Sequence, residues 1–155
     1  MQNFSSKAIQ FHKGNILDRT RFWPDALINP VNCVGVMGKG LALQFKRKFP
    51  DVFEKYKRAC IRGEIKLGEV LAIPDSGCFV INFPTKHHWR DKSKIEKIEL
   101  GLEDLVRKIQ ELEIKSISIP ALGCGEGGLD WDEVKPLIVN KLSPLNIKVM
   151  IFEPH

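Results

Sequence analysis

The segment LINPVNCVGVMGKGLALQFKRKFP (27–50) passes from an apolar run through a glycine-rich loop into a helical pattern. Its first residues form a short apolar run that ends in polar side chains, which indicates a strand. Leu41, Phe45 and Phe49 then recur at helical spacing, and Pro50 ends the pattern. A strand that leads through glycines into a helix is typical of the ligand-binding edge of an α/β sheet.

The rest of the chain alternates between strand and helix patterns. Further strands are predicted at residues 7–17, 68–74, 78–85, 114–122 and 147–154, and further helices at 50–64, 93–113 and 129–142. Ser93 and Glu96 have the spacing of a capping box at the start of the longest helix, and Asp130 is expected to cap the last one. This alternation predicts an α/β fold with a sheet flanked by helices on both faces.

The composition fits one globular domain, which we expect to span residues 1–155. The formal net charge is +5, and positive side chains gather at 46–48, 55–58 and 90–94. Such a surplus favours a phosphate-rich partner. Solvated helix faces would explain the same charge pattern, so charge alone leaves both readings open.

The sequence predicts a cytoplasmic protein without membrane association. It contains no apolar run long enough to cross a membrane, and residues 1–10 lack the plan of a signal peptide. The cysteines at 33, 60, 78 and 124 lie far apart and form no CxxC pair. We therefore expect reduced thiols and no disulfide framework.

Glycine-rich loops follow two of the predicted strands. One contains the glycines at 35, 38 and 40, and the other those at 123, 125, 127 and 128. Glycines let the backbone approach a ligand and point N–H groups at it, and each loop opens onto a predicted helix N-terminus, which favours an anion. Two such loops at one sheet edge suggest a pyrophosphate held between them; tight turns without a ligand are the alternative.

Two nucleotide-binding motifs are incomplete. GCGEGG (123–128) has the spacing of the dinucleotide fingerprint, but only one helix and one strand follow it. GVMGKG (35–40) lacks the spacing and the metal-binding hydroxyl of a phosphate loop. We therefore expect neither a dinucleotide-dependent enzyme nor an NTPase.

The histidines and cysteines predict no metal site. His87 and His88 are adjacent, so their side chains point in opposite directions along an extended chain, and no third ligand lies nearby in sequence. Cys33 and Cys124 lie in the glycine loops, but no histidine partner is evident for a nucleophilic pair. We expect activity without metal or cofactor.

Four segments resemble the macrodomain family, whose members bind ADP-ribose. They are KGNIL (13–17), LINPVNCVGVMGKGLALQFKRKFP (27–50), INFPTKHHWRDKS (81–93) and SIPALGCGEGGLDW (118–131), which in order and spacing span nearly the whole chain. NCVGVMGKGLALQFK (32–46) and FPTKHHWR (83–90) are most similar to the DarG-type branch. Those antitoxin macrodomains remove ADP-ribose from thymidine in DNA and thereby reverse a DarT-type toxin. The resemblance implies a three-layer sandwich around a mixed sheet of about six strands.

The resemblance also implies the ADP-ribose contacts, position by position. Asn15 and Ile16 would lie near the adenine, and Asn32 near the distal ribose. Macrodomains usually have aspartate in place of Asn15, whose amide oxygen can still accept from the adenine amino group, though without charge assistance. The residues implied to bind ADP-ribose are Asn15, Ile16, Asn32, Cys33, Val34, Gly35, Val36, Met37, Gly38, Lys39, Gly40, Leu41, Thr85, Gly123, Cys124, Gly125, Glu126, Gly127, Gly128 and Leu129.

Lys86 matches the catalytic lysine of the DarG branch and of the related human terminal ADP-ribose glycohydrolase. As a neutral amine it could attack the anomeric carbon or its opened aldehyde, and as a cation it could stabilise a departing thymine anion. The sequence leaves both roles open. The human relative also uses an aspartate in the second glycine loop, where this chain has Gly127.

The resemblance predicts a hydrolase that removes ADP-ribose from thymidine in single-stranded DNA, with ADP-ribose, ADP-ribosylated DNA and a DarT-type toxin as partners. His87, His88, Trp89 and Arg90 are the candidates for DNA contact; Trp89 would stack on an unpaired base, or else pack beneath the following helix. The alternatives are a non-catalytic reader of ADP-ribose, a hydrolase of ADP-ribose esters on protein carboxylates, and a general nucleic-acid-binding module.

Overall fold

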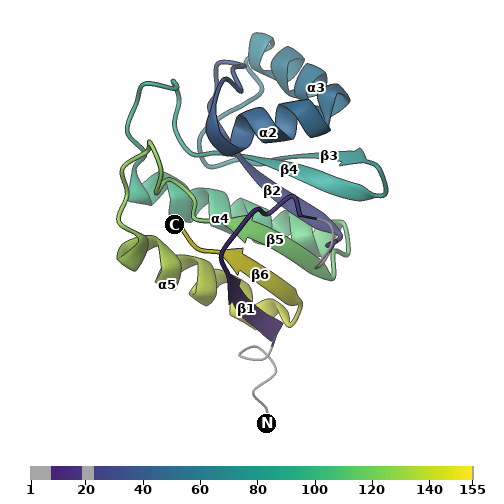
Figure 1. Cartoon of the computed structure of the whole chain (residues 1–155), viewed down its shortest axis with the longest axis vertical. Coiled ribbons are helices and arrows are strands. Elements are labelled where there is room, and N and C mark those ends of the chain that lie inside the picture. Colours follow the sequence, from purple (N-terminus) through teal and green to yellow (C-terminus); the bar gives the residue numbers. More distant parts are fainter. Residues whose placement is uncertain (1–7, 19–22, 155) are drawn as a thin grey trace.

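The computed structural model describes residues 8–18 and 23–154 and contains a six-stranded sheet (Figure 1). Its strands are β1 (Ile9–His12), β2 (Ala26–Val31), β3 (Leu71–Asp75), β4 (Cys78–Pro84), β5 (Ser116–Pro120) and β6 (Lys148–Phe152), in the spatial order β1-β6-β5-β2-β4-β3. β3 is antiparallel to β4, whereas every other pair is parallel. The prediction of a mixed sheet is therefore confirmed.

Helices cover both faces of this sheet. α2 (Gly40–Lys48) and α3 (Pro50–Ile61) lie on one face, and α4 (Ile95–Glu111) and α5 (Trp131–Leu142) lie on the other (Figure 1). A short 3-10 helix, η1 (Ser143–Leu145), precedes β6. The predicted three-layer arrangement is confirmed. Residues 1–7, which carry most of the stretch judged unlike a signal peptide and the start of the first predicted strand, lie outside the described residues.

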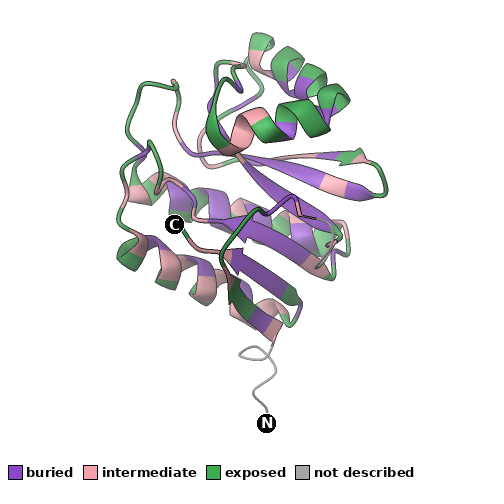
Figure 2. Ribbon diagram, viewed as in Figure 1, coloured by how far each residue is buried: buried purple, intermediate pink, exposed green. Residues whose placement is uncertain are grey.

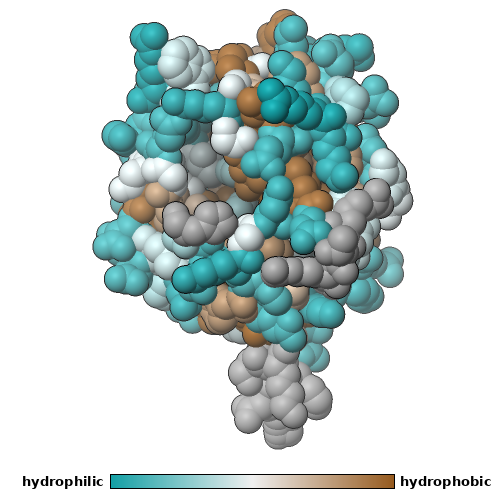
Figure 3. All heavy atoms as spheres, viewed as in Figure 1, coloured by the Kyte–Doolittle hydropathy of each residue, from teal (hydrophilic) through white to brown (hydrophobic). Residues whose placement is uncertain are grey.

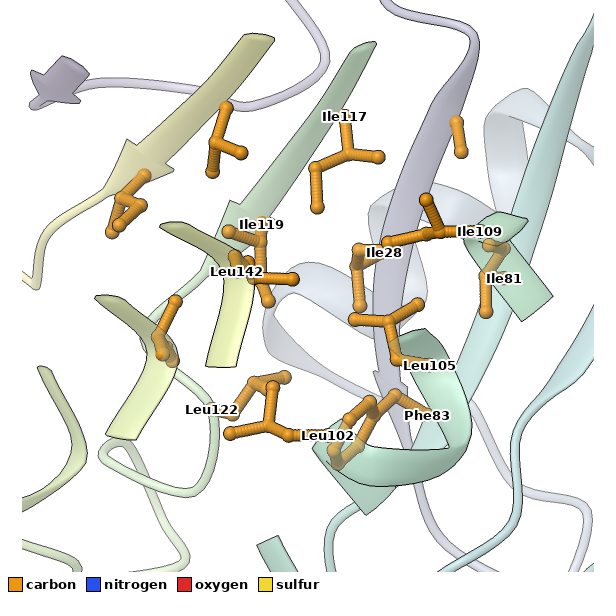
Figure 4. Packing of buried hydrophobic residues seen from close by; sticks show 14 of the residues in the cluster. Ile28, Ile81, Phe83, Leu102, Leu105, Ile109, Ile117, Ile119, Leu122 and Leu142 are labelled. Carbon is orange, nitrogen blue, oxygen red and sulfur yellow. The ribbon is translucent and has the colours of Figure 1, made fainter. Parts of the chain in front are cut away.

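The core is formed on both faces of the central strands. Leu27 and Ile28 are adjacent in β2 and point to opposite faces, yet both are 0% exposed. Ile28 packs with Leu102 and Leu105 of α4 (Figure 4), and Leu27 packs on the other face with side chains of α2 and α3. Each large apolar side chain buried in this way stabilises the fold by about 1.5–3 kcal/mol.

α4 approaches the end of β4 closely because it carries a glycine at the contact. A Cβ atom at Gly101 would overlap the ring of Phe83, which is fully buried between α4 and the sheet. Glycine in a helix interior costs about 0.5–1 kcal/mol relative to alanine. The close packing offsets that cost and fixes the strand end from which Thr85 and Lys86 follow.

The sheet order brings three loops to one edge. β2 lies between β5 and β4, and its register pairs Val31 with Pro84 at the carboxyl ends of β2 and β4. The loops that follow β2, β4 and β5 therefore leave the sheet side by side, at the left of Figure 1. Both glycine loops belong to this edge, as the sequence predicted, and the Lys86 segment that follows β4 lies there with them.

The predicted capping box at the start of α4 is wrong. Lys94 occupies the N-cap position without a side-chain cap, and the Ser93 hydroxyl is buried and has no hydrogen-bond partner among the described residues. Instead, the Ser93 backbone N–H donates to the Gly127 carbonyl at 2.9 Å. Ser93 therefore supports the second glycine loop. The predicted cap of α5 is confirmed, because the Asp130 side chain accepts from the Asp132 N–H at 2.9 Å.

In the face shown in Figure 3, hydrophilic side chains cover most of the area and apolar ones show mainly between them. Most exposed residues lie on the outer sides of the helices and in the loops, with some in the edge strand β1, whereas the central strands are buried (Figure 2). Within the described part of the chain, no helix combines the length and the apolar character that a membrane crossing requires.

Candidate active site

Two adjoining cavities run along the carboxyl edge of the sheet. The first, of about 650 Å³, is lined by all three edge loops, including Asn32, Lys86 and Glu126. The second, of about 470 Å³, is lined by Asn15, Ile16, Leu41 and other residues near the ends of β1 and β6. Ala121 and Gly125 line both cavities, so the two lie side by side, and together they are called the trough. Each has the size of a small-ligand pocket.

The first glycine loop is shaped by the side chain of Asn32. Its Oδ1 accepts from the N–H groups of Val34 at 3.0 Å and Val36 at 3.4 Å, and its Nδ2 donates to the Val36 carbonyl at 2.8 Å. These bonds fold the loop around the amide. Gly35 has a φ of +85°, a left-handed value that favours glycine. Asn32 therefore builds the loop as well as lining the cavity.

Tyr56 of α3 is a buried core residue that also supports this loop from behind. Its hydroxyl lies 2.8 Å from both Oδ1 and the backbone carbonyl oxygen of Asn32. Burial raises the pKa of Tyr56 above its ordinary value, and the nearby Cys60 adds to this effect. The hydroxyl is therefore a constant donor. In the sequence, the only indication of this supporting role is that Tyr56 places a hydroxyl group among the apolar residues on one side of the helix predicted at 50–64.

The first loop also leads into an open helix N-terminus. Lys39 is the N-cap of α2, its side chain forms no capping hydrogen bond, and the first turn contains no acidic residue. The free N–H groups and the helix dipole favour an anion at this point. Val36, Gly38 and Lys39 line the larger cavity beside it.

Several predicted ligand residues of the first loop lie behind the cavity. Met37 is buried with Tyr56, and Cys33 is buried against α3. Burial, with a smaller effect of Cys60, raises the pKa of Cys33 to about 11, so this thiol stays protonated. Val34, Gly35 and Gly40 line neither cavity. These residues shape the loop.

The second glycine loop is held by its own backbone. The Leu129 N–H donates to the Gly123 carbonyl at 2.9 Å, and the Gly128 N–H donates to that of Gly125 at 3.1 Å. Gly123 and Gly128 both have positive φ values. The following helix is capped by Asp130, so the open N-terminus expected after both loops is present only after the first.

Gly127 leaves no space for a side chain. A Cβ atom there would overlap the Ser93 hydroxyl and would lie 2.6 Å from the Gly123 carbonyl oxygen. An aspartate at this position therefore requires a different packing of Ser93.

Lys86 is held beside the first glycine loop by the backbone of its neighbours. The Thr85 N–H donates to the Val31 carbonyl at 2.9 Å, and the Cys33 N–H donates to the His87 carbonyl at 2.7 Å. Lys86 is half-buried and lines the larger cavity. Among the described residues, its amine has neither a hydrogen-bond partner nor an ion-pair partner. The amine is therefore available to a ligand.

A charged contact joins the two glycine loops across the cavity. The Lys39 amine lies 3.0 Å from a carboxylate oxygen of Glu126, and the Lys92 amine donates to the Glu126 backbone carbonyl at 3.4 Å. The pKa of Glu126 is lowered by the hydrogen bond from Lys39 and by the charges of Lys39, Lys86 and Lys92. Glu126 is thus a carboxylate surrounded by three ammonium groups.

The smaller cavity contains Asn15 in a fixed orientation. Its Oδ1 accepts from the Leu17 N–H at 2.9 Å, and its Nδ2 donates to Oε1 of Gln44 at 2.9 Å. Gln44, which sequence reasoning missed, follows the first loop by four residues and faces the same cavity. Cys124 also lines this cavity, and burial, with a smaller effect of Asp130, raises its pKa to about 11.

The residues after Lys86 lie at the mouth of the larger cavity. Trp89 and Arg90 line it, and the Trp89 ring is 42% exposed rather than packed beneath α4. His87 is exposed, and Nδ1 of His88 accepts from the Arg90 N–H at 3.1 Å. Within the described residues, no group of three or more His, Cys, Asp or Glu side chains is placed to hold a metal ion.

The fold and the trough define a class of protein. Residues 28–138 match the Macro domain family, and the chain belongs to this family. The two glycine loops and Lys86 are therefore parts of a macrodomain.

Several individual proteins are similar to this chain over nearly its whole length. A DNA ADP-ribosyl glycohydrolase of Thermus aquaticus is 47% identical over 152 residues, which are 94% of this chain and 41% of that protein. The macrodomain of Mycobacterium tuberculosis DarG has a TM-score of 0.90 and 45% identity, covering 95% of this chain and 98% of that one. Thermosipho africanus DarTG in complex with ADP-ribose has a TM-score of 0.85 and 36% identity, covering 94% and 41%. The chain thus spans about two fifths of the curated relative's length.

Proposed function

We propose that this macrodomain is a glycohydrolase that removes ADP-ribose from thymidine in DNA. The observation that carries the proposal is the free Lys86 amine in a cavity bounded by two glycine loops. The 47% identity to a DNA ADP-ribosyl glycohydrolase supports the same activity. The cavity, the lysine and the relatives therefore point to one reaction.

The trough accommodates ADP-ribose in one direction. The adenosine lies in the smaller cavity, where Ile16 supplies backbone groups and the Asn15 oxygen keeps one lone pair for the adenine amino group. The diphosphate lies at the shared part of the trough, between the open α2 N-terminus and the second loop. The distal ribose then reaches Asn32 and Lys86 in the larger cavity.

The reaction breaks the bond between the anomeric carbon of that ribose and the base nitrogen. The electron pair leaves with the base, which takes up a proton, and water finally supplies the new hydroxyl group on the sugar. Lys86 acts either as the nucleophile that first bonds to the carbon or as the cation that stabilises the departing base. Glu126 stays ionised beside it, but its contacts are with lysines and it is assigned no catalytic role.

DNA as the substrate agrees with the charge of the protein. The net charge is +5, and Lys39, Arg90 and Lys92 border the cavity. A thymine inside a duplex cannot reach the cavity, so the substrate is single-stranded or has the base turned out. The proposed partner is a DarT-type toxin whose modification this reaction reverses, in the cytoplasm where the DNA is. No metal or cofactor is required.

The test is release of ADP-ribose from a modified single-stranded oligonucleotide. Wild-type protein releases ADP-ribose, and Lys86→Ala loses the activity by about 100-fold or more. Lys86→Arg separates the nucleophilic role from the electrostatic role, because arginine keeps the positive charge but is not a nucleophile. This variant retains activity only if the role of Lys86 is electrostatic. Lys108→Ala, on α4 and paired with Glu111, is the matched control and keeps full activity.

Three results would overturn the proposal. Equal release by wild type and Lys86→Ala would remove the lysine from the mechanism. Tight ADP-ribose binding without release would instead indicate a reader, and release from ADP-ribosylated glutamate but not from DNA would indicate a protein-directed enzyme.

A further inference from the structure

The segment after Lys86 presents a stack of side chains at the cavity mouth. Cζ of Arg90 lies 4.5 Å from the centroid of the Trp89 ring, and the His88 ring centroid lies 4.8 Å from it, tilted by 32°. Trp89 is 42% exposed, which is unusual for so large an apolar side chain. An exposed aromatic ring paired with a cation is a surface suited to recognition.

This stack is fixed before any ligand binds. The Asp91 N–H donates to the His88 carbonyl at 2.9 Å, and the His88 N–H donates to Oδ2 of Asp91 at 2.9 Å. The Arg90 N–H donates to Nδ1 of His88 at 3.1 Å. These bonds hold the turn and reduce the entropy that a ligand would lose in ordering it.

Arg90 keeps its charge available. Although Asp91 is adjacent, its carboxylate accepts from a backbone N–H, and among residues 8–18 and 23–154 the Arg90 guanidinium has no carboxylate partner. A guanidinium that stacks on an aromatic ring can still bind a phosphate with its outer edge.

The three tryptophans of the chain show that Trp89 does not serve folding. Trp23 and Trp131 are partly buried and pack against the core clusters. Trp89 belongs to none of these clusters. Its exposure therefore lacks a packing explanation, and its removal should leave the fold intact.

The stack lies beside the proposed substrate site. Trp89, Arg90 and Lys86 line the same cavity, and Val36, 40% exposed, adds apolar surface from the first loop. A flat ring with a phosphate beside it matches an aromatic platform with an adjacent cation. A protein chain around a modified carboxylate has no backbone phosphate beside its side-chain rings.

We propose that Trp89 and Arg90 bind the nucleotide next to the modified thymidine, with its base on the ring and its phosphate at the guanidinium. This subsite rests on the proposed function and explains how the site selects single-stranded DNA over other ADP-ribosylated substrates. It contributes to binding of the strand and not to the chemistry at the sugar.

The experiment compares two substrates that differ only in neighbouring nucleotides. One is ADP-ribosylated thymidine monophosphate, and the other is a single-stranded oligonucleotide with the same modified base at its centre. Trp89→Ala lowers kcat/KM for the oligonucleotide by about 10- to 100-fold, the range expected for loss of one stacked base, and leaves the mononucleotide within about twofold. Trp89→Phe restores most of the activity, whereas Arg90→Ala mainly weakens the salt dependence for the oligonucleotide. Leu100→Ala, which removes a 46% exposed side chain from α4, is the control and changes neither substrate.

A binding measurement keeps the inference separate from the proposed function. Fluorescence anisotropy of a labelled, unmodified oligonucleotide reports DNA binding without the chemistry at the sugar, and Trp89→Ala should weaken this binding by the same factor. A wild type that releases no ADP-ribose, together with a loss of DNA affinity in Trp89→Ala, would support the nucleotide subsite and contradict the proposed hydrolase function. Equal losses on both substrates, or no loss on the oligonucleotide, would overturn the subsite.

Discussion

The two glycine loops look alike in sequence, but they are held in different ways. The first is built around side chains, because Asn32 binds its backbone and Tyr56 binds Asn32. The second is held by hydrogen bonds within its own backbone and by close contact of Gly127 with Ser93. The first opens onto an uncapped helix, whereas the helix after the second is capped by Asp130.

Because of this difference, the two loops contribute to anion binding in different ways. The first loop contributes the free N–H groups of α2, and with them most of the attraction for a phosphate. The second contributes a wall without side chains that the ligand can approach closely. Two similar sequence motifs therefore need not act in the same way. Substitutions in the two loops should have different effects on stability and on ADP-ribose binding.

The largest effect is expected from Gly127→Asp, which places a side chain where the second loop has no room. The new Cβ atom would overlap the Ser93 hydroxyl and press on the Gly123 carbonyl. Overpacking together with a buried charge should lower the free energy of unfolding by about 3 kcal/mol and abolish ADP-ribose binding. Urea unfolding followed by circular dichroism measures the first effect.

Gly125→Ala is the matched control in the same loop. A Cβ atom at Gly125 meets nothing within 4 Å, so the free energy of unfolding should change by less than about 0.5 kcal/mol. If both variants were equally stable, the second loop would be far more adaptable than its packing indicates.

A smaller effect is expected from Tyr56→Phe, which removes the support of the first loop but keeps the ring. Asn32 then loses a buried donor, and the free energy of unfolding should fall by about 1–2 kcal/mol. ADP-ribose affinity, measured by calorimetry, should fall by about threefold to tenfold because the loop loosens. Since burial raises the pKa of Tyr56, the stability difference should persist up to its ordinary value of 10.0.

The sign of the pH effect provides a second check on Tyr56. An unfolded tyrosine ionises above pH 10.0, whereas the buried one keeps its proton, so wild-type stability should decline as the pH rises through that value. Tyr56→Phe should lack this part of the decline. An identical pH profile for both proteins would show that the hydroxyl is not buried as described.

The sequence predicted the sheet and the edge loops because their signals are local. Apolar runs, the stripe of α4 and the glycines of both loops are visible within short windows. It also predicted that Lys86 would lie at the strand end with the two loops, and the structure places it there. That these residues bind ADP-ribose stays a prediction.

Sequence reasoning failed where a tertiary contact overrides a local pattern. Ser93 has capping-box spacing, but its N–H is bound to Gly127, which lies 34 residues further along the chain in a different loop. Tyr56 fits an apolar helical stripe, and only the fold reveals that its hydroxyl reaches Asn32, 24 residues away. Gln44 likewise becomes relevant only through its contact with Asn15.

A modest gain in affinity is expected from Glu126→Gln, which tests the charged contact between the loops. The carboxylate lies 3.0 Å from Lys39 and competes with a ligand phosphate for the surrounding lysines. Its removal should tighten ADP-ribose binding by about twofold to fivefold at low salt, and the gain should shrink as salt rises.

Glu111→Gln provides the control for net charge. Glu111 pairs with Lys108 on α4, away from the trough, at 3.6 Å, so the total charge changes by the same amount without touching the loops. Equal gains in both variants would mean that Glu126 acts only through net charge, and a loss in Glu126→Gln would mean that it helps to hold the ligand.

The smallest effect is expected from Ser93→Ala, which removes a hydroxyl from beside the second loop just as Tyr56→Phe removes one from behind the first. The Ser93 hydroxyl is buried without a partner, so its loss should leave the free energy of unfolding unchanged or raise it by up to about 1 kcal/mol. ADP-ribose affinity should stay within about twofold, because the Ser93 N–H still binds Gly127. If Ser93→Ala instead destabilised the protein as much as Tyr56→Phe, the second loop would also depend on a side-chain hydrogen bond, and the contrast between the loops would disappear.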